Sequence, residues 1–255
     1  RGPAPDFSIA FGSCHYANEP IFDRKGKPYG DTATDIFNRI ADKNPNLMLW
    51  LGDNIYLREP DWGSHSGIYA RYRHTRSQPA VQRLLSQCPN YAIWDDHDFG
   101  PNDANGSFLH KNLTLQAFHD HWANPSEGLP GQPGITSWFE YGDAQFFLLD
   151  NRYNRVRAED SAQATILGRT QLNWLKDALV AAPKDEWKVV CVGGQFLNTA
   201  AIHENYAIYA SERKEILDFI SSNDIKNVIF LSGDRHFAEL SILERPNEPR
   251  VIDFT

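Results

Sequence analysis

The sequence predicts a layered α/β fold, because short apolar segments alternate along it with segments of helical periodicity. The apolar segments are too short for helices and rich in strand-forming residues. They predict buried strands at Phe7–Phe11, Leu47–Leu51, Tyr91–Trp94, Gln145–Leu149, Lys188–Val192 and Val228–Leu231. Helical spacing predicts helices at Thr34–Lys43, Ile68–Arg76, Leu113–Trp122, Arg169–Val180 and Glu212–Ser221. Such an alternation favours sheets covered by helices.

Two further segments predict antiparallel strands, so we expect a mixed sheet. The turn at Tyr141–Ala144 joins two apolar runs within Trp138–Leu149, which indicates a hairpin. The segment Phe237–Thr255 also predicts strands, on either side of its two prolines. We find no shift of composition that would mark a linker, and no internal repeat. We therefore expect a single domain over residues 1–255.

The composition indicates a folded protein and argues against several classes. Hydrophobic residues make up 41% of the 255 residues, which is enough for a core. The formal net charge of -8 argues against binding nucleic acid or anionic membrane through bulk charge. No apolar run approaches the ~20 residues that span a bilayer. The three cysteines have no disulfide or zinc spacing, and the sequence gives no indication of oligomeric state.

Polar residues follow five of the expected strands directly. They are Cys14 after the first strand, Asp53 with Asn54 and Tyr56 after the second, Asp95 to Asp98 after the third, and later Gln195 and the Asp234-Arg235-His236 block. Ligands of α/β sheets bind beyond the carboxyl ends of the strands. We therefore expect these groups to converge on one site although they are far apart in sequence.

The chemistry of these groups predicts a metal centre. Aspartates 95, 96 and 98 would repel one another unless they were protonated, hydrogen-bonded or neutralised by cations. A thiol and a phenol beside carboxylates favour a trivalent ion such as iron. Oxygen-rich positions suit calcium, magnesium or manganese.

Each residue also has a structural explanation when it is taken alone. A Gly-Asp-Asn sequence is usually a turn, and Cys14 could be a buried thiol. Random placement, however, rarely puts potential ligands only at one end of a sheet. The joint pattern therefore favours a functional site.

Six blocks of the sequence resemble, in order, the signature blocks of the PhoD-like alkaline phosphatases. They are Phe11–Cys14, Leu51–Tyr56, Trp94–Phe99, Leu149–Tyr153, Leu167–Gln171 with Trp174–Leu175, and Ser232–His236. That family belongs to the calcineurin-like metallophosphoesterases. The resemblance implies a mixed α/β fold of two packed mixed β-sheets flanked by helices. It also implies metal-dependent hydrolysis of phosphoric esters through a metal-activated hydroxide or oxo nucleophile, in an alkaline phosphatase or phosphodiesterase.

The resemblance implies roles for the individual ligands. Asp53 would bridge metal ions, and Cys14 and Tyr56 would hold iron(III). Asp96, Asp234 and His236 would complete the iron and calcium shells. Further candidates, as ligands or as supporting residues, are Asn54, Asp95, Asn102 and Gln195. Carboxylates stand where the wider superfamily has imidazoles and amides, which favours harder ions over two zinc ions, although zinc, manganese and magnesium stay candidates.

Three side chains are candidates for direct action on the substrate. His97 lies in the carboxylate block without an evident need as a ligand, so it could donate a proton or hydrogen bond to the phosphate or leaving group. It could instead support Asp53 structurally. Arg152 and Arg235 could grip phosphate oxygens, or form surface ion pairs.

The expected substrate is a small phosphomonoester or phosphodiester, since the chain offers no basic stripe for nucleic acid. The resemblance further implies an exported protein, periplasmic or extracellular, although the sequence contains no signal peptide.

Two other functions are open at this stage. A thiol hydrolase would pair Cys14 with a histidine such as His15, but adjacent residues of a strand point apart and the aspartates would be unexplained. A non-catalytic metal-binding module could keep the same fold without turnover. The presence of candidate ligands in every block argues against that second alternative.

Overall fold

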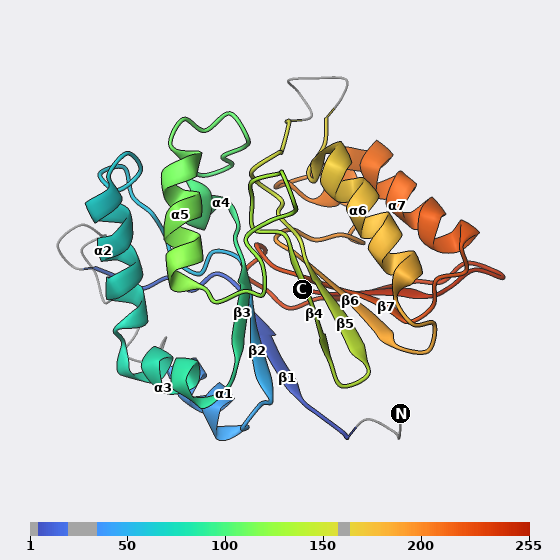
Figure 1. The fold of residues 1–255 in the computed structure, drawn as a ribbon, viewed down its shortest axis with the longest axis horizontal. Helices are drawn as coiled ribbons and strands as arrows, with labels where there is room; N and C mark the ends of the chain where they lie inside the picture. The colour runs from blue at the N-terminus through green and yellow to red at the C-terminus, as the bar shows by residue number, and fades with distance from the viewer. Residues whose placement is uncertain (1–4, 20–34, 158–163) are drawn as a thin grey trace.

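The chain forms four layers, with two β-sheets packed between two groups of helices (Figure 1). The computed structural model describes residues 5–19, 35–157 and 164–255. The smaller sheet has the order β1-β2-β3 and is parallel, with strands at Ile9–Gly12, Leu47–Leu51 and Asn90–Ile93.

The larger sheet has the order β4-β5-β6-β7-β9-β8. In chain order its strands are Ser137–Tyr141, Ala144–Leu148, Trp187–Val192, Val228–Ser232, Leu240–Leu243 and Val251–Phe254. The outermost strands β4 and β8 run antiparallel to their neighbours, and the other pairs are parallel. The expected hairpin is β4 and β5, and the strands expected in Phe237–Thr255 are β8 and β9. The two-sheet α/β fold is therefore confirmed.

Helices cover the outer face of each sheet (Figure 1). On the smaller sheet they are α1 (Asp35–Asp42), α2 (His65–Arg76), α3 (Pro79–Gln87) and α5 (Lys111–His121). On the larger sheet they are α6 (Gly168–Ala181) and α7 (Ala210–Ser222). Two short elements, α4 (Asp96–Phe99) and the 3-10 helix η1 (Tyr206–Tyr209), lie in connections. Thr34, which was expected to begin the first helix, lies outside the described residues. Among the described residues, no helix is long and apolar enough to cross a membrane.

Burial between layers explains why the central strands are apolar along their whole length. All five residues of β2 are buried, because helices cover one face and the larger sheet covers the other. Across the sheet interface the rings of Tyr91 and Phe139 stack with their centroids 4.0 Å apart. A second core lies between the larger sheet and helices α6 and α7.

The carboxyl ends of strands from both sheets meet at one place. A Cβ on Gly233, just after β7, would lie 2.6 Å from the carbonyl oxygen of Leu51 and 2.8 Å from the Cβ of Ser13. Only glycine allows that approach. Gly52 has a φ of +97°, and a Cβ there would lie 2.7 Å from the Cβ of Asp95. This close contact brings the polar loops of the two sheets together.

Asp150 connects the sheets just below this junction. It follows β5 and is 1% exposed. Its carboxylate accepts hydrogen bonds from the indole Nε1 of Trp94 at 2.8 Å and from the backbone N–H groups of Arg152 (2.9 Å), Tyr153 (2.9 Å) and Ile135 (3.1 Å). One buried side chain thus satisfies four donors from three segments.

We predict that Asp150→Ala lowers the free energy of unfolding by roughly 3–5 kcal/mol, because four buried donors lose their acceptor. Urea unfolding followed by circular dichroism measures the change. Asp177→Ala, on the exposed face of α6, is the matched control and should stay within about 0.5 kcal/mol of wild type. Equal stability of the two variants would show that the Asp150 network is not important for folding.

Candidate metal centre

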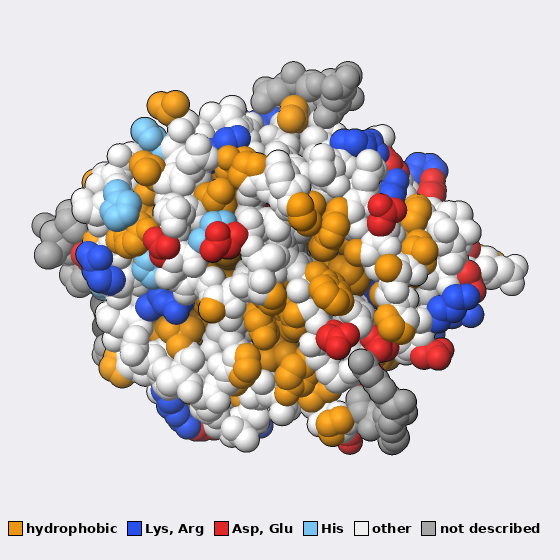
Figure 2. Space-filling model, viewed as in Figure 1, with side chains coloured by type: hydrophobic (Ala, Val, Ile, Leu, Met, Phe, Trp, Pro, Cys, Tyr) orange, Lys and Arg blue, Asp and Glu red, His pale blue; other side chains and the backbone are white. Residues whose placement is uncertain are grey.

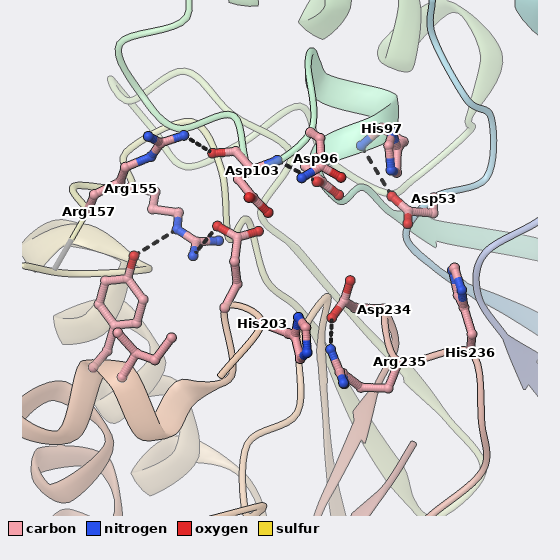
Figure 3. A pocket seen from close by; sticks show the side chains of 14 residues that line it. Asp53, Asp96, His97, Asp103, Arg155, Arg157, His203, Asp234, Arg235 and His236 are labelled. Atoms are coloured by element: carbon pink, nitrogen blue, oxygen red, sulfur yellow. Dashed lines mark hydrogen bonds and ion pairs between the residues drawn. The ribbon is translucent and has the colours of Figure 1, made fainter. Parts of the chain in front are cut away.

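A pocket of about 590 Å³ opens where the strand ends of the two sheets meet (Figure 3). Its apolar wall consists of Ile208 and Tyr209. The rest of the lining is polar or charged: Asp53, Asp96, His97, Asn102, Asp103, Arg155, Arg157, His203, Glu204, Asp234, Arg235 and His236. Loops after β2, β3, β5, β6 and β7 contribute these residues, as expected for a site at the carboxyl ends of strands.

Asp53 lies at the centre of this arrangement and is 1% exposed. It belongs to three groups of potential metal ligands whose donor atoms all lie within 4.8 Å of one another. Its companions in these groups are Cys14 with His236, Asp96 with His97, and Asp95 with Asp234. A carboxylate with two oxygens in this position can serve more than one ion.

The thiol and phenol donors lie on one side of Asp53. The Cys14 thiol lies 3.7 Å from Asp53 Oδ2, and the Tyr56 hydroxyl donates to the same oxygen at 3.4 Å. The Tyr56 oxygen also lies 3.3 Å from Nε2 of His236. Burial, and next the Asp53 charge, raise the pKa of both the thiol and the phenol. A nearby cation would have to replace these protons if the two groups are to act as ligands.

The other side of Asp53 is a cluster of buried carboxyl groups. Burial, followed by repulsion from Asp96, Asp95 and Asp98, raises the pKa of Asp53 well above its ordinary range. Burial, followed by repulsion from Asp95 and Asp96, raises the pKa of Asp234 to about 7. The pKa of Asp96 is lowered, because Arg152 and then His97 outweigh the opposing effect of burial. If all of its carboxyl groups were ionised, the cluster would therefore carry more negative charge than its own arginine compensates.

Two carboxylate oxygens of this cluster have no hydrogen-bond partner within the described residues. They are the buried Oδ2 of Asp95 and Oδ1 of Asp96. The Arg152 guanidinium lies 3.7 Å from the Asp96 oxygen, which is beyond hydrogen-bond distance. Buried oxygens of this kind are normally paired or coordinated.

The backbone at four candidate ligands is in the left-handed region. The φ angles are 62° at Cys14, 52° at Asp53, 72° at Asp234 and 56° at His236. Residues other than glycine adopt this conformation at a cost, and such strain concentrates at functional sites. Converging donors, unpaired oxygens, excess negative charge and strained loops all fit a centre that holds metal cations.

Asp98 and Arg152 support this cluster from behind. Asp98 accepts hydrogen bonds from the backbone N–H groups of Asn54, Ile55 and Asp95 at 3.0, 3.3 and 3.0 Å. Arg152 was expected at the phosphate, but it is 1% exposed and does not line the pocket. Its guanidinium instead bonds Asp95 at 2.5 Å and Glu204 at 2.9 Å.

The remaining candidates from the sequence divide into two groups. Arg235 lines the pocket, with its guanidinium 3.6 Å from the Asp234 carboxylate, and Asn102 lines it too. Asn54 and Gln195 do not. Asn54 donates to the carbonyl oxygen of Ile93 at 2.8 Å, and Gln195 donates to Glu239 at 3.1 Å and to Thr255 at 3.2 Å.

His97 lies at the pocket between Asp53 and Tyr56. Its backbone N–H donates to Asp53 Oδ1 at 3.2 Å, and its ring centroid lies 4.3 Å from that of Tyr56. Burial lowers its pKa against the opposing effect of the nearby carboxylates. A ring nitrogen in this position can contact either a ligand of the pocket or an ion held by Asp53 and Asp96.

The structure adds pocket residues that the sequence did not indicate. Glu204 forms an ion pair with Arg155, whose Nε donates to the Tyr209 hydroxyl at 3.0 Å (Figure 3). Arg157 donates to the carbonyl oxygen of Asp103 at 2.8 Å. The recurrence of arginine at 152, 155 and 157 was a possible signal. Glu204 and Asp103 lie in loops with no comparable pattern.

The alternative of a thiol hydrolase finds no support in this arrangement. Neither ring nitrogen of His15 has a hydrogen-bond partner within the described residues, so His15 is not hydrogen-bonded to the Cys14 thiol. The raised pKa of Cys14 also disfavours a free thiolate.

Two packed sheets with a carboxylate-rich centre at their shared strand ends define a metallophosphoesterase type of fold. A solved structure of PhoD matches 99% of this chain and 57% of its own, with a TM-score of 0.78 and 22% identity. The structure of a purple acid phosphatase from yellow lupin (Lupinus luteus) seeds matches 97% of this chain and 43% of its own, with a TM-score of 0.65 and 10% identity. These matches confirm the fold.

The family model described as PhoD-like phosphatase matches residues 24–252, so the chain belongs to the PhoD-like phosphatase family. Alkaline phosphatase D of Bacillus subtilis (strain 168) is 24% identical over 281 residues, which cover 91% of this chain and 46% of that protein. The chain thus spans about half of the length of this relative. The family resemblance inferred from the motif blocks is confirmed.

We predict that Asp53→Asn lowers the metal content of the purified protein, because three groups of donors lose a shared negative charge. Elemental analysis of protein prepared in parallel measures the loss, and circular dichroism checks the fold. Asp177→Asn, on the exposed face of α6, should keep the wild-type metal content. Full metal content in Asp53→Asn would exclude Asp53 as a shared ligand.

Proposed function

We propose that this chain is a metal-dependent hydrolase of phosphoric esters. The observation that carries the proposal is the convergence of Cys14, Tyr56, Asp96, Asp234 and His236 on Asp53, which lines the pocket. Membership of the PhoD-like phosphatase family supports the same reaction class.

We assign the two sides of Asp53 to different ions. Cys14, Tyr56 and His236 with Asp53 would hold iron(III), because thiolate and phenolate suit a trivalent ion. Asp53, Asp95, Asp96 and Asp234, with Asn102 nearby, would hold calcium or another divalent ion such as manganese, magnesium or zinc. When bound, these ions supply a water nucleophile of lowered pKa and positive charge for the phosphate oxygens.

The chain's own residues complete the reaction. Arg235 lines the pocket and can bind a phosphate oxygen with its guanidinium. His97 can donate a proton to the leaving oxygen, or a hydrogen bond to the phosphate. Arg152 is buried and does not line the pocket, so it is not placed to bind the phosphate. It orients Asp95 through a 2.5 Å hydrogen bond, and its charge opposes the rise that burial gives the pKa of Asp95.

The proposed substrate is a small phosphomonoester or phosphodiester. Positive and negative side chains are interspersed over the face shown in Figure 2, and the described residues form no continuous basic stripe on that face. The net charge of -8 disfavours binding of nucleic acid through a broad field. We further propose that the protein acts outside the cytoplasm, a proposal that rests on the family resemblance alone.

A non-catalytic metal-binding module is the alternative. It would need only the ligands, whereas the pocket also offers His97 and Arg235 beside them. These two groups favour turnover over binding alone.

We predict that the purified protein contains iron together with calcium or another divalent ion and hydrolyses p-nitrophenyl phosphate, bis-p-nitrophenyl phosphate or both. A phenolate on iron(III) should add a visible charge-transfer band that disappears in Tyr56→Phe. Elemental analysis, absorption spectra and assays of one sample provide the test. Active protein that contains only zinc would refute the iron assignment, and metal-loaded protein without activity on either ester would favour the binding module.

We predict that His97→Ala retains its metals but hydrolyses alkyl phosphate esters ~10²- to 10⁴-fold more slowly, the range typical of proton donation by a positioned side chain. p-Nitrophenolate needs little protonation, so its ester should lose less rate if His97 is an acid. The rates of both esters and the metal content are measured together, with His65→Ala on the exposed part of α2 as control.

The pattern of losses assigns the role of His97. Equal losses on both esters would indicate a contact with the phosphate, since that contact does not depend on the leaving group. Loss of metal would make His97 a ligand or a residue that supports the ligands. Wild-type rates on both esters with metals retained would contradict any direct role.

A further inference from the structure

A small internal cavity lies behind the metal centre, on the other side of the loops that carry Cys14 and Asp53. Cys14 and Asp53 belong to the cluster of candidate ligands. The residues that follow them, His15 and Asn54, line this second cavity instead. The two loops are tied together by backbone hydrogen bonds from Cys14 to Gly52 at 3.1 Å and from His15 to Asp53 at 2.8 Å. Each loop thus presents one residue to the metal centre and the next to the cavity.

The cavity is lined by polar atoms that lack partners within the described residues. They are Nδ1 and Nε2 of His15, the amide oxygen Oδ1 of Asn54, Nη1 of Arg76 at the end of α2, and the indole Nε1 of Trp122. All five atoms are shielded from solvent. Native proteins rarely leave buried polar atoms unpaired, and ordered water commonly satisfies those that protein groups cannot reach.

The side chains around the cavity are held in place by other contacts. The amide nitrogen of Asn54 donates to the carbonyl oxygen of Ile93 at 2.8 Å, which fixes the amide group while its oxygen stays without a partner within the described residues. The His15 ring packs edge-on against Phe37, with centroids 4.5 Å apart. The Arg76 guanidinium lies over the Trp122 ring at 4.5 Å. These contacts leave the unpaired atoms little freedom to find other partners.

The size and chemistry of the cavity identify its ligand. It offers about 10 Å³ to the centre of a water-sized sphere, and ~10–15 Å³ of such volume suffices for one water. Water can accept a hydrogen bond from Arg76 and donate one to the Asn54 oxygen. A halide ion could accept from Arg76 but could not donate to that oxygen, and the Arg76 charge would repel a metal cation.

We infer that this cavity binds one ordered water molecule that joins His15, Asn54 and Arg76. The water links the two loops that carry Cys14 and Asp53 to helix α2. Arg76 is therefore a positioning residue, which acts on the metal centre through the water and the loops. Partners behind the ligands of a metal commonly change metal affinity ~10- to 100-fold when they are removed.

The test combines a high-resolution crystal structure with the kinetics of metal release. In metal-loaded wild type we expect a water peak within hydrogen-bond distance of Asn54 Oδ1 and Arg76 Nη1. Arg76→Met keeps an apolar stem over Trp122 but removes the donors, so it should lose this peak. It should release metal to a chelator ~10-fold faster. Arg73→Met, on the exposed face of α2, should match wild type in both respects.

Several results would overturn the inference. An empty cavity in wild type, or an anomalous bromide peak there after soaking, would exclude water as the ligand. Metal release at the wild-type rate from folded Arg76→Met would exclude the positioning role. If Arg76→Met does not fold, the wild-type density still decides whether water is bound. None of these measurements uses phosphate hydrolysis, so they stand apart from the proposed function.

Discussion

The mutual repulsion of buried carboxyl groups is the constraint on which the rest of the structure depends. Asp53, Asp95, Asp96 and Asp98 are each at most 4% exposed, and Asp234 faces the same pocket. Water cannot screen charges in such a place, so each must be protonated, hydrogen-bonded or balanced by a cation. Arg152 balances only part of this charge, chiefly at Asp95 and Asp96. The arrangement of these carboxyl groups is therefore the one expected of the protein ligands in a metal cluster.

The fold provides the rigidity that such a cluster needs. Strands from two sheets end at the same place, and Gly52 and Gly233 permit their loops to approach more closely than a Cβ would allow. Behind the loops, Asp98 binds three backbone N–H groups, and Asp150 binds four donors. Left-handed conformations at Cys14 and Asp53 are held in place by this surrounding structure.

Much of this arrangement could be predicted because it depends on patterns local in sequence. Apolar runs followed by glycine and a polar block located the strand ends, and parallel strands brought those ends together. Helix α3 was missed: Pro79 starts it only three residues after Arg76 ends α2, so the pair lacked a clear boundary. Most of the predicted strands and helices differ from the observed ones only at their ends. There the boundary is set by hydrogen bonding and not by apolar periodicity.

The sequence could not give the direction of each side chain within the polar loops. Asn54 follows Asp53 directly, yet it faces a separate cavity, because the backbone at Asp53 is left-handed. Gln195 bonds Glu239 and Thr255 on neighbouring strand ends, a contact that requires the three-dimensional packing of β6, β8 and β9. From the sequence alone, Arg152 could equally have reached a phosphate in the pocket or the carboxylates of Asp95 and Asp96. In the structure it bonds Glu204, which is 52 residues away in sequence, and sequence patterns do not reveal such a contact.

The thermal unfolding midpoint of metal-stripped protein, measured before and after metal ions are returned, tests the central claim most directly. If cations balance the carboxylate cluster, ions that bind the folded state should raise the midpoint, and the rise should grow with free metal concentration. The same titration on Asp53→Asn should give a much smaller rise. A midpoint that does not change on addition of iron, calcium, manganese, magnesium or zinc would contradict the account, since the cluster would then be stable without any cation.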